Sequence, residues 1–110
     1  MGPPRHLALL PDLAAERVAW PAPFADGIPR LLGVRPRRTV VLASGDPFWF
    51  GAGAALARRL DPGEWRACPG RSTFSLAASR LGWPLEETAC FGLHAAPLAR
   101  LRPVLAPGAR

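Results

Sequence analysis

The sequence predicts an α/β fold in which a mostly parallel sheet is flanked by helices. Residues 39–43 form a short apolar run rich in β-branched side chains, which is typical of a strand buried on both faces of a parallel sheet. The run ends in a Ser-Gly-Asp-Pro turn, and residues 52–60 then contain mostly good helix formers. A second unit follows, with a short strand at residues 65–68, a Pro-Gly break and a helix at residues 74–81. Repetition of strand, loop and helix is the βαβ pattern of a parallel sheet.

The segment ahead of residue 39 predicts three shorter elements. Residues 6–10 suit one or two helical turns, and residues 17–20 suit a short strand that prolines cut off. Residues 24–32 place apolar side chains on one helical face, with Gly33 as the terminator. A basic turn at residues 35–38 then leads into the central strand.

The last third of the sequence predicts one well-marked helix and two weaker elements. Ser72 or Thr73 is the expected N-cap of the helix at residues 74–81, because short hydroxyl side chains accept bonds from first-turn amides. Residues 88–93 suit a further strand, and residues 97–105 suit a short helix interrupted by a proline.

Length and composition limit the class of protein. A chain of 110 residues is enough for one small domain and too short for two ordinary ones. No run approaches the roughly 18 uninterrupted apolar residues of a membrane span, and no basic-then-apolar leader opens the sequence. We therefore expect a cytoplasmic protein without a membrane partner.

The cysteines and histidines do not predict a metal site. Cys68 and Cys90 lack CxxC spacing, and neither His6 nor His94 lies near a cysteine in the sequence. We expect no bound metal, and we predict that both thiols are buried and reduced.

The formal net charge of +6 is due to arginine, since all fourteen basic residues are arginines. They are dispersed, apart from a group at residues 35–38, and they are not interleaved with an aromatic platform. This distribution argues against a nucleic-acid partner. A surplus of arginine also suits a small polyanionic ligand, because the guanidinium fork matches carboxylates.

Two motifs follow each other in the sequence, LASGDPFWFGAG and CPGRSTFSLAASRLGWPLEE. In this order they resemble the tetrapyrrole methylases, which transfer a methyl group from S-adenosyl-L-methionine to a porphyrin-type or corrin ring. The Trp83-Pro84 context and the later FGLHAAPLARLRPVLAPG are most similar to the branch that acts on precorrin-6Y in cobalamin (vitamin B12) biosynthesis, methylating carbons 5 and 15. The similarity begins at about Arg5. It implies a methyltransferase with a precorrin, a tetrapyrrole, as its substrate.

The resemblance also implies that residues 1–110 are one partial domain, an incomplete amino-terminal lobe. Members of the family have a further strand and a glycine-rich loop ahead of the region matched by residues 2–10, and a second α/β lobe beyond residue 110. The cofactor lies between the lobes, so a second lobe or a homo-oligomer is expected to be needed. A sheet without its first strand exposes an edge and an apolar face, which predicts self-association or instability in isolation.

The same resemblance implies a set of cofactor-binding residues that lie on two loops. They are Ser44, Gly45, Asp46, Trp49, Ser72 and Thr73. Loop amides and hydroxyls can satisfy the carboxylate and ammonium of the methionyl group, and Asp46 supplies one negative charge. Methyl transfer from a sulfonium needs mainly alignment, so no catalytic nucleophile is nominated. The decarboxylation of this pathway belongs, within the family, to a separate module without counterpart here.

Each of these residues has a structural alternative. Ser72 and Thr73 can act as helix caps alone, and Trp49 can be a core or lobe-interface aromatic. His94 stands where relatives have a histidine followed by glycine and arginine, but here two alanines follow, which favours a structural role.

Three functions remain as hypotheses. The first is an enzyme fragment, and the second is a catalytically inactive interaction module that retained the methylase lobe fold. The third, a nucleic-acid or nucleotide-binding module, ranks last because the Ser-Gly-Asp-Pro loop lacks the lysine of a phosphate-binding loop. The sequence leaves open the corrinoid intermediate, the cobalt status and the oligomeric state.

Overall fold

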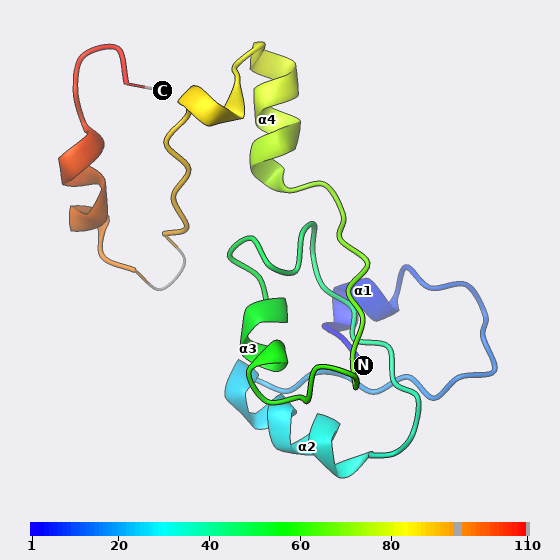
Figure 1. Ribbon diagram of the computed structural model, residues 1–110. Coiled ribbons are helices and arrows are strands. Elements are labelled where there is room, and N and C mark those ends of the chain that lie inside the picture. Colours follow the sequence, from blue (N-terminus) through cyan, green and yellow to red (C-terminus); the bar gives the residue numbers. More distant parts are fainter. Residues whose placement is uncertain (94–95, 110) are drawn as a thin grey trace.

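The computed structural model describes residues 1–93 and 96–109 (Figure 1). The helical elements of this part are, in chain order, α1 (Pro4–Leu7), η1 (Phe24–Asp26), α2 (Gly27–Gly33), α3 (Gly53–Ala57), α4 (Thr73–Leu81), η2 (Leu85–Glu87) and η3 (Leu98–Val104). The helices predicted at residues 24–32 and 74–81 are confirmed. Those predicted at residues 52–60 and 97–105 form as the shorter α3 and as the 3₁₀ segment η3.

Where the sequence predicts a sheet, the structure has segments that run parallel to each other but pair over too few residues to form regular strands. Gly2 and Ala19 form a parallel bridge. The Gly2 N–H donates to the Val18 carbonyl oxygen at 3.1 Å, and the Trp20 N–H donates to the Gly2 carbonyl oxygen at 2.8 Å. In a parallel pair, a residue on one segment forms hydrogen bonds with the two residues that flank its partner on the other segment. Gly2 follows this pattern with the two neighbours of Ala19.

The other edge of this amino-terminal segment meets residues 40–42. The Met1 amino group donates to the Val40 carbonyl oxygen at 2.7 Å, and the Leu42 N–H donates to the Met1 carbonyl oxygen at 2.9 Å. Burial lowers the pKa of the Met1 amino group below its usual value. Within the described part of the chain no regular strand forms, so the predicted parallel sheet is not confirmed and only these paired edges are observed.

The molecule is more extended than a compact chain of its length. Its radius of gyration is 17.0 Å and its extents are 52 × 28 × 27 Å. A compact domain of this length has a radius of gyration of about 13 Å. In Figure 1 most of the chain from α4 onward projects away from the part that contains α1, α2 and α3, while Phe74 at the start of α4 packs near Trp49 and Phe50. The two parts therefore leave apolar surface uncovered.

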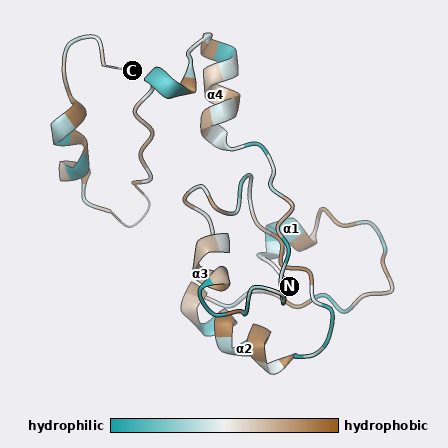
Figure 2. Ribbon diagram, viewed as in Figure 1, coloured by the Kyte–Doolittle hydropathy of each residue, from teal (hydrophilic) through white to brown (hydrophobic). Residues whose placement is uncertain are grey.

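Few apolar side chains are buried. The buried hydrophobic residues are Leu31 in α2, Leu56 in α3 and Ala78 in α4, and hydrophobic stretches of α2 and α4 are drawn in brown in Figure 2. Large apolar side chains are exposed elsewhere, among them Val40 at 68% and Phe50 at 63%. Exposed apolar area of this extent indicates surfaces suited to contact with another polypeptide.

The best-formed element is α4, and its ends follow the predicted local chemistry. The Ser75 N–H donates to Ser72 Oγ at 3.1 Å, which confirms Ser72 as the N-cap. Gly82 has φ +66° directly after the last helical residue, in the left-handed region that favours glycine. The α4 helix therefore begins and ends where the sequence specifies.

The prediction that both cysteines are buried is wrong for Cys68, which is exposed, while Cys90 is partly buried. Both thiols are free. Cys68 is exposed because residues 65–68 have no regular secondary structure and form no backbone hydrogen bond to a neighbouring segment. Among the described helices, none has the length and hydropathy to cross a bilayer.

Candidate functional site

One cavity of about 600 Å³ brings together the residues that the sequence nominated for cofactor binding. Its lining includes all six of them, Ser44, Gly45, Asp46, Trp49, Ser72 and Thr73. They come from two loops, residues 44–49 and residues 72–73, which are far apart in the sequence. Tertiary structure therefore places the two motifs at one site.

A backbone hydrogen bond joins the two loops. The Gly70 N–H donates to the Gly45 carbonyl oxygen at 3.1 Å. Gly45 has φ +56°, and a Cβ placed on it would lie 2.9 Å from the Arg71 carbonyl oxygen. A side chain at Gly45 would therefore strain the backbone and push the loops apart.

Asp46 stabilises its own turn. Its Oδ1 atom accepts a hydrogen bond from the Phe48 N–H at 2.8 Å, and its carbonyl oxygen accepts one from the Trp49 N–H at 3.3 Å. This is the side-chain-to-backbone bonding by which aspartate specifies turns. Asp46 is partly buried, and its carboxylate retains acceptor capacity for a ligand.

Several backbone amides that border the cavity have no acceptor within the described residues. They belong to Gly45, Asp46, Thr73 and Phe74. The last two are in the first turn of α4, where helix geometry leaves N–H groups free and the helix dipole favours negative charge. These donors fit a carboxylate, such as that of an amino-acid group.

Aromatic side chains form one wall of the cavity. The ring centroids of Trp49 and Phe50 lie 5.7 Å apart, those of Trp49 and Phe74 lie 6.3 Å apart, and those of Phe50 and Phe74 lie 6.0 Å apart. Trp49 is 51% exposed, and Phe50 has φ +54°, which is unusual for a bulky residue. We call Trp49, Phe50 and Phe74 the aromatic wall.

The sequence interpretation missed His6 and Arg5, which also line this cavity. His6 Nε2 lies 3.1 Å from Ser44 Oγ, and the Arg5 Nη2 donates to the same oxygen at 3.5 Å. The buried Nδ1 atom of His6 has no hydrogen-bond partner among the described residues. The sequence held a signal for the placement of these two residues, because loops that follow neighbouring parallel segments meet at the same edge of a sheet. The Arg-His pair follows such a segment, Met1 and Gly2.

The remaining predictions concern metals and His94. No group of three or more metal-ligating side chains occurs in the part of the chain that the structure describes. His94 lies outside the described residues.

Sequence comparisons relate this chain to known proteins. Residues 34–109 match the family of tetrapyrrole (corrin/porphyrin) methylases. A precorrin-6Y C(5,15)-methyltransferase [decarboxylating] from Sinorhizobium sp is 46% identical over 107 residues, which are 96% of this chain and 26% of that protein. The protein of the same name from Mycobacterium tuberculosis H37Rv is 37% identical over 95 residues, 84% of this chain and 24% of that protein.

A shorter relative differs in the reaction that its name gives. Cobalt-precorrin-7 C(5)-methyltransferase from Salmonella typhimurium is 32% identical over 86 residues, 78% of this chain and 43% of that protein. The chain thus spans about a quarter of the first relatives and less than half of this one. No solved structure matches significantly.

Proposed function

We propose that this chain, which belongs to the tetrapyrrole (corrin/porphyrin) methylase family, is part of an S-adenosyl-L-methionine-dependent methyltransferase of cobalamin biosynthesis. It acts on a ring carbon of a precorrin and is of the precorrin-6Y C(5,15) type, as the names of its relatives suggest. The observation that carries this proposal is the single cavity lined by both predicted cofactor loops. As a soluble methylase it acts in the cytoplasm.

The residues of the cavity suit the parts of the cofactor. When bound, S-adenosyl-L-methionine supplies an electrophilic methyl group on a sulfonium. The free amides of Gly45 and Thr73 would hold the methionyl carboxylate, and the Asp46 carboxylate would hold the ammonium. The rings of Trp49 and Phe74 offer apolar surface for the adenosyl group.

The contribution of these residues to catalysis is alignment. Direct methyl transfer from a sulfonium requires no enzyme nucleophile, and the reaction needs a fixed distance between the methyl group and an electron-rich ring carbon. A precorrin carries carboxylates on its periphery, and Arg5 and His6 lie beside Ser44, where they can hold such a group. The aromatic wall then restricts water from one side.

The described cavity is open, which supports the need for a second lobe or a second copy of the chain. Trp49 and Phe50 are more than half exposed, and the extended segments leave backbone groups unpaired. We infer that residues 1–110 form one partial domain of the family's α/β fold, and that a further strand completes a parallel sheet in the intact protein.

The test is calorimetric titration of the purified 110-residue chain with S-adenosylhomocysteine. It is done with and without the part of the Sinorhizobium relative that follows the matched region, expressed separately. We expect heat of binding when the second part is present. Absence of binding in both cases, by a chain whose α-helical circular dichroism is intact, contradicts cofactor binding by this polypeptide.

A second candidate is an inactive interaction module that retained the methylase lobe fold. The exposed aromatic wall favours it, since such a surface can bind another subunit without any cofactor. In that case the second part of the relative binds the chain equally well with and without S-adenosylhomocysteine, whereas a split active site binds more tightly with it.

A further inference from the structure

Three polar side chains form a cluster at the wall of the cavity that both predicted cofactor loops line. They are Arg5 and His6, which belong to α1, and Ser44, which follows residues 39–43. Ser44 Oγ lies 3.1 Å from His6 Nε2 and 3.5 Å from Arg5 Nη2, and Arg5 Nε lies 3.4 Å from His6 Nε2. We call these three residues the polar cluster. Because each member contacts the other two, the position of one hydrogen constrains the rest.

The arginine determines which atoms of the polar cluster are acceptors. A guanidinium has only donors and offers no lone pair to a hydrogen bond. Arg5 Nε therefore donates to His6 Nε2, and Arg5 Nη2 donates to Ser44 Oγ. A histidine whose Nε2 atom accepts a hydrogen bond is neutral and carries its proton on Nδ1.

The hydroxyl of Ser44 then donates to His6. Since Ser44 Oγ accepts from Arg5, its own hydrogen is left to donate, and His6 Nε2 lies within reach at 3.1 Å. A hydroxyl that donates to an unprotonated imidazole nitrogen is the arrangement by which a base removes a proton from a hydroxyl. The polar cluster can therefore take up a proton from a group that contacts Ser44.

The buried side of the His6 ring agrees with this arrangement. Its Nδ1 atom is buried and has no hydrogen-bond partner among the described residues. An N–H that is buried without an acceptor costs less when the ring is neutral than when it is charged. The burial of Nδ1 thus fits the neutral ring that the hydrogen bonds of Arg5 require.

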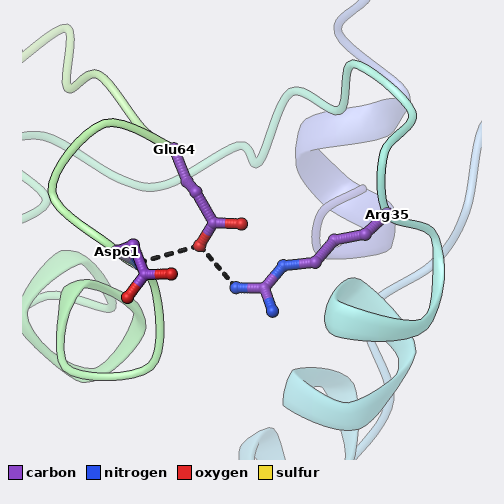
Figure 3. Close-up of polar contacts among 3 residues, drawn as sticks. All are labelled: Arg35, Asp61 and Glu64. Atoms are coloured by element: carbon purple, nitrogen blue, oxygen red, sulfur yellow. Dashed lines mark hydrogen bonds and ion pairs between the residues drawn. The ribbon is translucent and has the colours of Figure 1, made fainter.

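Arg5 differs from the arginines that form ion pairs. Arg35 pairs with Glu64, whose carboxylate also accepts from the Asp61 N–H, as Figure 3 shows. Arg5 has no ion-pair partner within the described part of the chain, and Asp46, the other charged residue of the cavity lining, forms none with it. Its guanidinium retains donors for a substrate carboxylate. Such a carboxylate would offset the positive charge that His6 gains when it accepts a proton.

We propose that Ser44 and His6 accept the proton that a ring carbon loses when it is methylated, and that Arg5 positions them for this step. The inference rests on the proposed methyltransferase function and goes beyond the alignment of the reactants. Ser44 contacts the group that releases the proton, and His6 receives the proton through Ser44.

One proton is released for each methyl group that a ring carbon bearing hydrogen receives. The electron pair of the new C–CH3 bond comes from the ring, and the pair of the broken S–CH3 bond stays on sulfur. The ring then carries one additional positive charge, which it loses with a proton. Ser44 Oγ takes this proton while its own hydrogen passes to His6 Nε2, and His6 later releases the proton to solvent.

Nitrogen NMR of the imidazole tests the hydrogen arrangement without cofactor or corrinoid. The isotope-labelled His94→Gln chain has His6 as its only histidine. At mildly alkaline pH we expect a proton on Nδ1 and none on Nε2. Adding Arg5→Met, which removes the donors to Nε2 and Ser44, should increase the form protonated on Nε2. If that form already dominates with Arg5 in place, the proposal is overturned, whether or not the Arg5 variant folds.

Methyl transfer tests the role of the two residues. The assay combines the 110-residue chain with the second part of the Sinorhizobium relative, and precorrin-6Y is the methyl acceptor. We expect His6→Gln to lower kcat by about a hundredfold and to remove the acid limb of the pH–rate profile. The affinity for S-adenosylhomocysteine should change by less than about tenfold. Ser44→Ala should lower kcat similarly, and the conservative Ser44→Thr should recover most of it.

Chemical rescue separates proton transfer from a structural role. Imidazole added to the His6→Ala chain should restore part of the lost rate, and more basic imidazoles should restore more, because the rate follows the strength of the base. Absence of methyl transfer by the unmodified chain contradicts the proposed function itself. Transfer by His6→Gln at the unmodified rate, with the same pH profile, overturns the present proposal and leaves that function standing.

Discussion

The carbonyl oxygen of Gly45 accepts a hydrogen bond from the Gly70 N–H, and this 3.1 Å contact ties the two loops of the candidate site together. Ser44, Gly45 and Asp46 lie on one side of it and Ser72 and Thr73 on the other. Gly45 also lines a larger cavity, of about 940 Å³, to which residues 39–43 and residues 65–68 contribute. The candidate cofactor cavity and the open sheet edges therefore both depend on this one hydrogen bond.

Replacing Gly45 with alanine should separate the loops. The residue has φ +56°, and its Cβ would lie 2.9 Å from a backbone oxygen, so we expect a loss of about 1–2 kcal/mol in the free energy of unfolding. Urea denaturation measures it. Gly63→Ala is the matched control, because a Cβ there meets nothing within 4 Å. Equal effects of both changes would contradict the special role of Gly45.

Removing the cap of α4 should weaken the helix and the site together. Ser72→Ala deletes the acceptor of the Ser75 N–H, for which we expect a cost of about 1 kcal/mol and a lower thermal midpoint by circular dichroism. Ser79→Ala is the control, since that hydroxyl donates to the Leu76 carbonyl oxygen within the same helix and caps nothing. A midpoint unchanged in Ser72→Ala would contradict this assignment.

His6 and Ser44 should act as a coupled pair in ligand binding. A double-mutant cycle of His6→Ala and Ser44→Ala, with S-adenosylhomocysteine affinity as the readout in the presence of the second lobe, should give a coupling of about 0.5–1.5 kcal/mol. The physical reason is their 3.1 Å contact at the cavity wall. Strictly additive effects would show that the contact has no part in the site.

The isolated chain should self-associate through its open edges. Val40 is 68% exposed and lines the cavity of about 940 Å³, and Val40→Lys should shift the sedimentation profile toward the monomer, because an edge lysine opposes strand pairing. Leu9→Lys is the control, since Leu9 is 81% exposed but does not line that cavity. A monodisperse, cooperatively unfolding monomer of the unmodified chain contradicts the prediction.

Local elements were predictable to the extent that neighbouring residues specify them. Ser72 and Gly82 bound α4 because a cap and a left-handed glycine act within one helical turn. The strands were less predictable. Residues 65–68 have a strand-like composition but are left without a neighbour, and pairing depends on residues distant in the sequence. The exposure of Cys68 follows from the same absence of a neighbouring strand.

The sequence by itself determined the family, the positions of the main helices and the six residues nominated for the cofactor site, because these are properties of local order and motif. Only the tertiary structure placed both loops around one cavity, brought His6 to Ser44 and left two parallel edges open between Arg35–Glu64 and Gly45–Gly70. These relationships depend on contacts between segments far apart in the chain, so the local sequence of each segment does not specify which partner it meets.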